Sequence, residues 1–275
     1  MIDADYGLTF DKSRIMGILN VTPDSFSDGG KYLQREAAVE QAFRMEAEGA
    51  DIIDIGGESS RPGATPISET EELNRILPVI TEIRKRSTIL LSVDTYKARV
   101  ANEALQYGVN WVNDISALRM DPDMHRVVKK WDCPVVLMHM LGDPSTMQVN
   151  PYYQHVLADL HAFFSERIQY SISCGIKKII LDPGIGFGKR LEDNLLILKR
   201  LDTFRQYGYP LLIGTSRKSF IGTITGRKVE DRSAGTLATI GWSVAQGVSI
   251  VRTHEVAAAY DTLNLIHSIQ ATMPT

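Results

Sequence analysis

Eight short apolar segments recur along the chain, and each is followed by a segment with helical periodicity. The apolar segments are residues 15–21, 51–57, 88–94, 111–116, 134–140, 178–184, 210–216 and 248–255. Their apolar character is nearly continuous, which is typical of strands buried on both faces of a parallel sheet. Residues 36–45 show the helical pattern between them. Glycines that can form left-handed helix C-caps precede several of the strands: Gly49, Gly108, Gly175, Gly208 and Gly247.

The alternation predicts an α/β fold of one particular kind. Eight strands in strict alternation with helices over 275 residues indicate a (β/α)8 TIM barrel. We expect residues 1–275 to form a single domain, because no Pro/Ser-rich linker divides the chain. An open doubly wound sheet is the alternative. It requires a glycine-rich fingerprint after the first strand, and Asn20-Val21-Thr22-Pro23 does not provide one.

Charge and cysteine content exclude several classes of function. A net charge of −3 gives no reason to expect nucleic acid or a membrane surface as a partner. The two cysteines, Cys133 and Cys174, form neither a disulfide framework nor a metal-spaced cluster. Residues 1–14 lack the basic and apolar regions of a secretory signal, and no apolar stretch is long enough to span a bilayer. We therefore expect a cytoplasmic protein.

Nearly every predicted strand ends in a polar or ionisable side chain. These side chains are Asn20, Asp54, Glu58, Asp94, Asn113, Asp114, His139, Asp182, Ser216, Arg217, Lys218, Arg252 and His254. Active sites of barrels lie at the carboxyl ends of the strands and in the loops that follow. Because burial of unpaired polar groups costs several kcal/mol, this rim is predicted to face a polar ligand.

Eight motifs, one at each predicted strand end, resemble the dihydropteroate synthase family. They are NVTPDSFSDGG, GGESSRPG, SVDT, NDI, LMHM, DPGIGFGK, GTSRKSFIG and RTHEV, in this order from about Met16 to Val256. The resemblance implies an enzyme of folate biosynthesis that condenses 6-hydroxymethyl-7,8-dihydropterin diphosphate with para-aminobenzoate. The products are 7,8-dihydropteroate and pyrophosphate, and sulfonamides compete for the aminobenzoate site in this family. The resemblance also implies a homodimer.

The resemblance places a pterin pocket at the middle strands. Its implied residues are Asp94, Asn113, Met138, Asp182, Phe187 and Lys218. The residue types suit the ligand, because a carboxylate accepts two parallel hydrogen bonds from the N–H and amino groups of a pterin edge. Asn113 offers both a donor and an acceptor.

The diphosphate is assigned to the first, second and eighth strand ends. The implied residues are Asn20, Ser60, Arg252 and His254, and Asn20 would also bind Mg2+, the expected cofactor. One neutral oxygen ligand is enough for Mg2+ only because the substrate supplies other ligands. Arg252 and His254 are two residues apart, so on a strand both would point the same way. The helix predicted after Val256 adds a favourable N-terminal dipole.

Two long loops complete the implied site. The aminobenzoate contacts would be Phe26, Ser60, Arg61, Pro62, Phe187 and Ser216, and the catalytic roles would fall to Asp28, Arg61 and Lys218. We expect the loops after the first and second strands to be mobile and to act as lids, because a reactive pterin cation would be trapped by water unless water were excluded. Many family members have Thr where this chain has Ser60.

Several residues and functions stay outside this assignment. Asp54 is interpreted as a brace of the barrel interior, Asp114 as structural, and His139 as a residue of the interior or rim. Two alternatives remain open. One is a methyltetrahydrofolate-binding methyltransferase domain, which would leave SRKS, RTH and the RPG loop unexplained. The other is a non-catalytic pterin-binding paralogue, in which loss of Lys218, Arg252 or the first lid would be expected.

Overall fold

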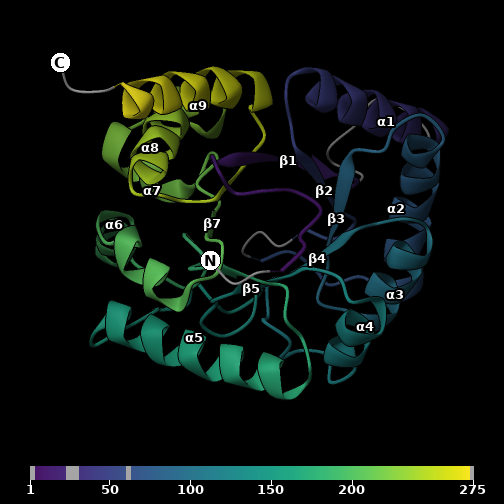
Figure 1. The fold of residues 1–275 in the computed structure, drawn as a ribbon, viewed down its shortest axis with the longest axis horizontal. Helices are drawn as coiled ribbons and strands as arrows, with labels where there is room; N and C mark the ends of the chain where they lie inside the picture. The colour runs from purple at the N-terminus through teal and green to yellow at the C-terminus, as the bar shows by residue number, and fades with distance from the viewer. Residues whose placement is uncertain (1–3, 23–30, 60–62, 273–275) are drawn as a thin grey trace.

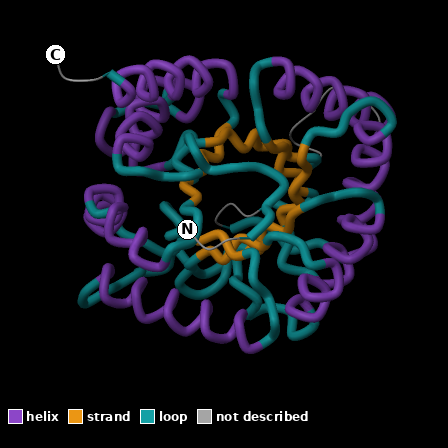
Figure 2. Tube along the Cα trace, viewed as in Figure 1, coloured by secondary structure: helices purple, strands orange, loops and turns teal. Residues whose placement is uncertain are grey.

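The strands form a ring at the centre of the molecule and the helices surround it (Figures 1 and 2). The computed structural model describes residues 4–22, 31–59 and 63–272. The strands are β1 (Arg14–Asn20), β2 (Ile52–Gly56), β3 (Leu90–Asp94), β4 (Trp111–Asp114), β5 (Val135–Met138), β6 (Ile179–Asp182), β7 (Leu212–Ile213) and β8 (Ile250–Thr253). All paired strands are parallel.

The order of the strands is that of a nearly closed barrel. The ladder runs β6-β5-β4-β3-β2-β1-β8-β7, so the first strand pairs with both the second and the eighth. An isolated bridge between Leu181 and Leu211 joins β6 to the chain just before β7. The barrel predicted from the sequence is thereby confirmed, and the open doubly wound sheet is excluded.

The helices form the outer layer of the barrel. They are α1 (Lys31–Ala47), α2 (Glu69–Arg84), α3 (Ala98–Gln106), α4 (Met124–Trp131), α5 (Val156–Ser173), α6 (Leu191–Lys199), α7 (Ser219–Thr225), α8 (Ser233–Ala245) and α9 (Val256–Ala271). The described part of the chain also contains two 3-10 helices, Leu201–Tyr207 and Val229–Asp231. The five predicted C-cap glycines all have positive φ, between +74° and +98°. No helix in the part of the chain that the structure covers could cross a membrane.

Apolar side chains fill the barrel at its amino end. Met16, Ile52, Trp111 and Ile250 pack there with Tyr6, which precedes the first strand. The Tyr6 hydroxyl donates to the Ile179 carbonyl oxygen, and Trp111 Nε1 donates to the Tyr6 carbonyl oxygen. The N-terminal segment therefore closes this end of the barrel, and the opposite end, where the strands terminate, is left for a ligand.

All the strands except β1 are shorter than the apolar segments of the sequence. The segment predicted at 210–216 contributes only Leu212–Ile213 to the sheet, and the one at 134–140 contributes Val135–Met138. Residues such as Leu211 and Val248 are buried although they lie outside the strands. The predicted mobility of the loops after β1 and β2 concerns mainly residues 23–30 and 60–62, which lie outside the described residues.

Candidate active site

The register of the parallel strands brings most of the predicted pterin residues to one end of the barrel. Gly56 of β2 pairs with Asp94 of β3, which in turn pairs with Asn113 of β4. Met138 and Asp182, the last residues of β5 and β6, pair with each other. Because paired residues of parallel strands lie side by side, the polar strand ends form a continuous rim.

A buried network of charges occupies the middle of this rim. Arg252 Nε lies 2.6 Å from Asp54 Oδ2, and Arg252 Nη2 lies 2.6 Å from Asp94 Oδ2. Asn113 Nδ2 also donates to Asp54 Oδ2, at 2.8 Å. The interpretation of Asp54 as a brace outside the site was therefore incomplete, because Asp54 orients two predicted ligand-binding side chains. The sequence feature that indicates this role is the position of Asp54 within an apolar strand, where its side chain is fully buried.

Burial changes the protonation of both predicted pterin carboxylates. The pKa of Asp94 is raised to about 7, because desolvation outweighs the stabilising charge of Arg252. The pKa of Asp182 is raised to about 6, again by burial, although the Gly184 N–H and the charge of Lys218 oppose the rise. Such shifted carboxylates in a concave site are candidates for ligand binding. Ionised, each can accept paired hydrogen bonds.

The segment after β6 wraps closely against the end of β5. Gly184 donates its N–H to Asp182 Oδ1 at 2.7 Å, and its φ is +66°. A Cβ at Gly184 would lie 2.1 Å from the His139 carbonyl oxygen, so only glycine fits. Phe187, further along the segment, packs against an apolar cluster that includes Met138. An aromatic ring system could be held between this cluster and the Asp182 carboxylate.

Lys218, in the loop after β7, also reaches the Phe187 ring. Its Nζ lies 4.0 Å from the centre of the Phe187 ring, and its stem packs over Gly186. Burial and the charge of Arg252 lower its pKa to about 8. The preceding residue, Arg217, has φ +55°, a sparsely populated conformation for a residue with a side chain. This backbone turn separates Ser216 from Lys218.

Ser216 and His254 form a second polar pair on the rim. Ser216 Oγ lies 2.9 Å from His254 Nδ1 and also accepts the His254 N–H at 3.3 Å. Because β8 ends at Thr253, His254 lies beyond the strand and does not follow its alternation. The guanidinium of Arg252 contacts the two carboxylates, whereas the imidazole of His254 contacts Ser216. The two side chains therefore have different partners.

Asp114 has the structural role that the sequence indicated. Its carboxylate accepts the N–H groups of Ser116 and Leu118 and the Ser116 hydroxyl. Ala117 and Leu118 both have positive φ, so the carboxylate stabilises an unusual turn after β4. This role accounts for the burial of Asp114.

A second cluster of charges beside the site was not identified from the sequence. Lys97 Nζ lies 2.6 Å from both Glu58 Oε2 and Glu72 Oε2 and donates to the Ile67 carbonyl oxygen at 2.8 Å. Glu58 also accepts the Ile67 N–H and the Tyr96 hydroxyl. The cluster joins the two ends of the chain segment between β2 and α2. A cavity of about 10 Å³, lined by Glu58, Glu72, Asp94, Thr95, Tyr96, Ile115 and Pro144, separates it from the rim.

Mg2+ is the metal that the sequence resemblance implies. Asn20, its predicted ligand, is the half-buried last residue of β1. Its side-chain oxygen lies near Gly56, at the carboxyl end of β2. Over the parts of the chain that are described, no three or more His, Cys, Asp or Glu residues form a metal site. A single amide oxygen fits Mg2+ when a diphosphate supplies further oxygen ligands.

Five predicted site residues lie outside the described residues. They are Phe26, Asp28, Ser60, Arg61 and Pro62. The structure thus brings together the remaining predicted residues: Asn20, Asp94, Asn113, Met138, Asp182, Phe187, Ser216, Lys218, Arg252 and His254.

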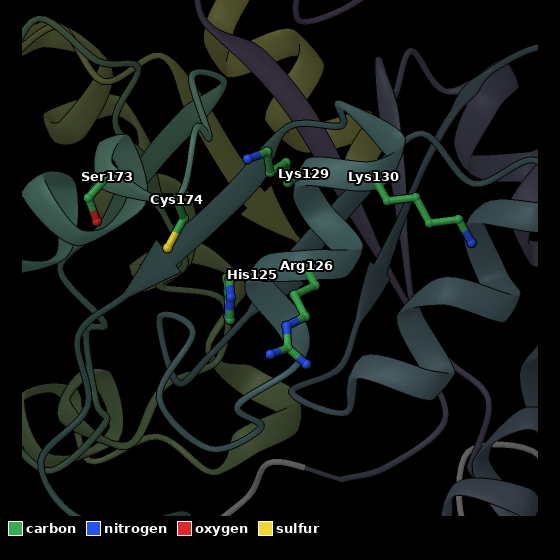
Figure 3. Close-up of a pocket in the computed structure, with 6 residues that line it drawn as sticks. All are labelled: His125, Arg126, Lys129, Lys130, Ser173 and Cys174. Carbon is green, nitrogen blue, oxygen red and sulfur yellow. The ribbon is translucent and has the colours of Figure 1, made fainter.

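Another hollow lies on the outer layer of helices (Figure 3). It is lined by His125, Arg126, Lys129, Lys130, Ser173 and Cys174, from α4 and from the C-terminal end of α5. That end of α5 leads into the start of β6 and not toward the rim. The hollow shares no residue with the candidate active site.

Comparison with known proteins gives the family. The family model for pterin binding enzymes matches residues 16–254. The dihydropteroate synthase of Haemophilus influenzae is 46% identical over 254 residues, which cover 92% of each chain. A Yersinia pestis dihydropteroate synthase in a sulfonamide drug complex has a TM-score of 0.93 at 40% identity, covering 99% of this chain and 100% of that one. A Xanthomonas albilineans dihydropteroate synthase in complex with 7,8-dihydropteroate has a TM-score of 0.88 at 42% identity, covering 97% of both chains.

The matched region runs from β1 to the end of β8 and so includes every strand end that forms the rim. Both the sequence relatives and the solved structures cover nearly the whole chain. The chain therefore belongs to the dihydropteroate synthase family of pterin-binding enzymes.

Proposed function

We propose that this protein is an active dihydropteroate synthase. It condenses 6-hydroxymethyl-7,8-dihydropterin diphosphate with para-aminobenzoate, giving 7,8-dihydropteroate and pyrophosphate in folate biosynthesis. The observation that carries the proposal is the convergence of Asp94, Asn113, Asp182 and Lys218 on one rim, with Phe187 beside them. The related structure that holds 7,8-dihydropteroate supports the choice of ligand.

The pterin binds between the carboxylates and the Phe187 ring. Asp182 accepts two parallel hydrogen bonds from the pterin edge, because its Oδ1 is already oriented by the Gly184 N–H. Asn113 donates one amide hydrogen bond to Asp54, and its side-chain carbonyl oxygen accepts a hydrogen bond from the pterin in this proposal. Lys218 donates to the ring from above Phe187. Met138 and Phe187 supply the apolar surface.

The diphosphate lies over the ends of β1 and β8. Asn20 would hold Mg2+, which would offset part of the negative charge of the diphosphate and make it a better leaving group. Ser60, Arg252 and His254 complete this subsite in the proposal. The N-terminus of α9 begins two residues after His254, and its unpaired N–H groups favour an anion there.

Bond breaking precedes bond making. The C–O bond between the pterin methylene and the diphosphate breaks first, since the electron-rich ring stabilises the cation that remains. The aminobenzoate nitrogen then attacks this carbon and loses a proton. Phe26, Ser60, Arg61, Pro62, Phe187 and Ser216 hold the aminobenzoate, and Asp28, Arg61 and Lys218 stabilise the charges that develop. Closure of the surrounding loops would exclude water from the cation.

The protein acts as a cytoplasmic homodimer in this proposal. Cys133 and Cys174 are free, which suits a reducing compartment. Large apolar side chains are exposed on three neighbouring helices: Leu195 and Leu196 on α6, Trp242 on α8, and Leu265 and Ile269 on α9. Trp242 Nε1 donates to the Leu198 carbonyl oxygen, so α8 lies against the end of α6. Light scattering coupled to gel filtration would measure the mass in solution, and a monomer would contradict the homodimer.

The activity has a direct test. Purified protein is incubated with the pterin diphosphate, Mg2+ and para-aminobenzoate, and dihydropteroate and pyrophosphate are quantified. We expect equal amounts of both products in the complete mixture, and no dihydropteroate when aminobenzoate is omitted. Pterin binding without product would favour a non-catalytic paralogue. Transfer of a methyl group from methyltetrahydrofolate would favour the methyltransferase alternative, for which the comparisons give no support.

A further inference from the structure

Lys189 is a buried cation that the proposed reaction does not use. Only 3% of its surface is exposed, although it follows directly after the segment that carries Asp182 and Phe187. No carboxylate forms a salt bridge with it among the described residues. A buried lysine without such a partner needs another source of stabilisation.

Four acceptors surround the Lys189 ammonium. Its Nζ lies 2.9 Å from the Gly184 carbonyl oxygen and 2.9 Å from the Phe187 carbonyl oxygen. It also lies 3.0 Å from His139 Nδ1 and 3.2 Å from the His139 carbonyl oxygen. An ammonium has three N–H donors, so the longest contact shares a donor with another. The ammonium thus lies at the centre of the loop that follows β6. Its hydrogen bonds connect this loop to His139, the residue after β5.

Burial and the nearby positive charges keep His139 neutral. Burial, together with the positive charges of Lys189 and Arg119, holds the pKa of His139 well below its usual range. The imidazole is therefore neutral and its Nδ1 accepts from Lys189. The Lys189 pKa is itself lowered to about 7 by burial, while the charge of Asp182 opposes this change.

The acceptors of Lys189 belong to the residues that shape the pterin pocket. Gly184, whose carbonyl oxygen accepts from Lys189, donates its own N–H to Asp182 Oδ1. Phe187, whose carbonyl oxygen also accepts, presents its ring beneath Lys218 Nζ. Without the ammonium, the His139 and Phe187 carbonyl oxygens would lose this donor, and the Gly184 carbonyl oxygen would keep the Phe187 N–H at 3.1 Å. The segment from Gly184 to Phe187 would then be held less firmly against the end of β5.

We propose that Lys189 is a positioning residue for the pterin pocket. It acts through Gly184 on the orientation of the Asp182 carboxylate, and through the Phe187 backbone on the placement of the aromatic ring. This inference rests on the proposed function, because it names the pterin as the ligand that benefits.

The test compares two lysine variants. Lys189→Met keeps the length of the side chain and removes its donors. Lys178→Met is the control, because Lys178 Nζ also donates to a backbone carbonyl oxygen, that of Asp132, and its side chain is only 19% exposed. Unlike Lys189, Lys178 also pairs with a carboxylate, the exposed Asp132 Oδ2 at 2.8 Å. Lys178 directly precedes β6 and lies at the amino end of the barrel, away from the rim. Binding of 6-hydroxymethyl-7,8-dihydropterin is measured by calorimetry, and turnover is measured in parallel.

Lys189→Met is expected to raise the pterin Kd and the KM for pterin diphosphate about tenfold or more, corresponding to about 1.4 kcal/mol or more. Lys178→Met is expected to change neither by more than about twofold. A variant that merely folds poorly would contain less active protein, so its kcat would fall while its KM stayed constant. An unchanged KM for Lys189→Met would therefore overturn the proposal.

Substitutions at His139 keep the proposal testable if Lys189→Met does not fold. His139→Leu removes one acceptor and is expected to raise the pterin Kd about threefold, whereas His139→Asn retains an acceptor and should bind almost as the wild type does. Equal binding by wild type and His139→Leu would count against Lys189 as a positioning residue. A wild-type protein that neither binds pterin nor forms dihydropteroate would instead contradict the proposed function, so the two failures are distinguishable.

Discussion

Arg252 and Asp94 meet across the carboxyl end of the barrel, with Nη2 of the arginine 2.6 Å from Oδ2 of the aspartate, although 158 positions separate them in the sequence. They belong to β8 and β3, and β1 and β2 lie between these strands in the sheet. The same guanidinium reaches Asp54 on β2. The Arg252 side chain thus links the last strand to the second and third strands. Its positive charge balances the negative charges of Asp54 and Asp94.

Replacement of Arg252 by methionine is expected to destabilise the protein. It would leave Asp54 and Asp94 buried without their counter-charge, which costs about 3–5 kcal/mol when one partner of a buried pair is removed. Urea denaturation measures the loss. The double variant Arg252→Met with Asp54→Asn should recover part of it, because one of the unpaired charges is then absent. A loss below about 1 kcal/mol would show that solvent already screens the pair.

Asp182→Asn is expected to weaken pterin binding and leave the fold intact. The amide keeps one acceptor for the Gly184 N–H but offers only donors where the second carboxylate oxygen stood. A lost charge-assisted hydrogen bond corresponds to about 1.5–3 kcal/mol, or roughly a tenfold to hundredfold increase in Kd. Calorimetric titration with the pterin measures the change. Wild-type affinity would remove Asp182 from the pocket.

Pterin affinity should fall in mild acid. In the proposed site the ionised carboxylates bind the ligand, and burial raises the pKa of Asp94 to about 7 and of Asp182 to about 6. Since both values exceed the ordinary 3.8, the free folded protein takes up protons as the pH drops through these values, and the ligand must displace them. Affinity should decline about tenfold per pH unit below about 7 and more steeply below about 6. In Asp182→Asn the second, steeper phase should disappear. Calorimetry between about pH 5 and 8 measures the pterin affinity. An affinity that does not change with pH would show that neither carboxylate titrates in this range.

Gly184→Ala should be far more harmful than the same change at another left-handed glycine. Gly184 and Gly226 have similar φ values, +66° and +71°, but a Cβ at Gly226 meets nothing within 4 Å. Gly226→Ala is therefore expected to cost only the backbone penalty, about 1–2 kcal/mol. Gly184→Ala adds the clash with the His139 carbonyl oxygen and should exceed about 3 kcal/mol in total. Thermal unfolding of both variants gives the comparison, and equal losses would mean that the loop can move aside.

The sequence predicts the barrel well because its strands are buried on both faces. An apolar segment indicates burial, and each of the eight predicted segments overlaps one strand of the sheet. The same signal overestimates strand length, since Leu211 and Val248 are already buried before strands β7 and β8 begin. The two-residue strand β7 is the extreme case, because Pro210 and Gly214 flank it closely.

The rim was also predicted, but the contacts within it were not. Strand-end position identifies Asp94, Asn113 and Asp182, since the carboxyl ends of barrel strands surround the opening. Position does not reveal how far a long side chain extends, so the reach of Arg252 to Asp54 was missed. Lys189 was missed for a related reason. Its side chain folds back on the loop that precedes it, and such a contact leaves no periodic pattern in the sequence.

The closure of the amino end of the barrel by Tyr6 and Trp111 has a kinetic consequence. Substrates can enter only at the opposite end, and both products have to depart through the same opening. A pyrophosphate that lingers after the reaction would occupy the place of the next diphosphate. Product inhibition by pyrophosphate should therefore be competitive with respect to the pterin diphosphate, and the enzyme's throughput would depend on how quickly the cell removes pyrophosphate.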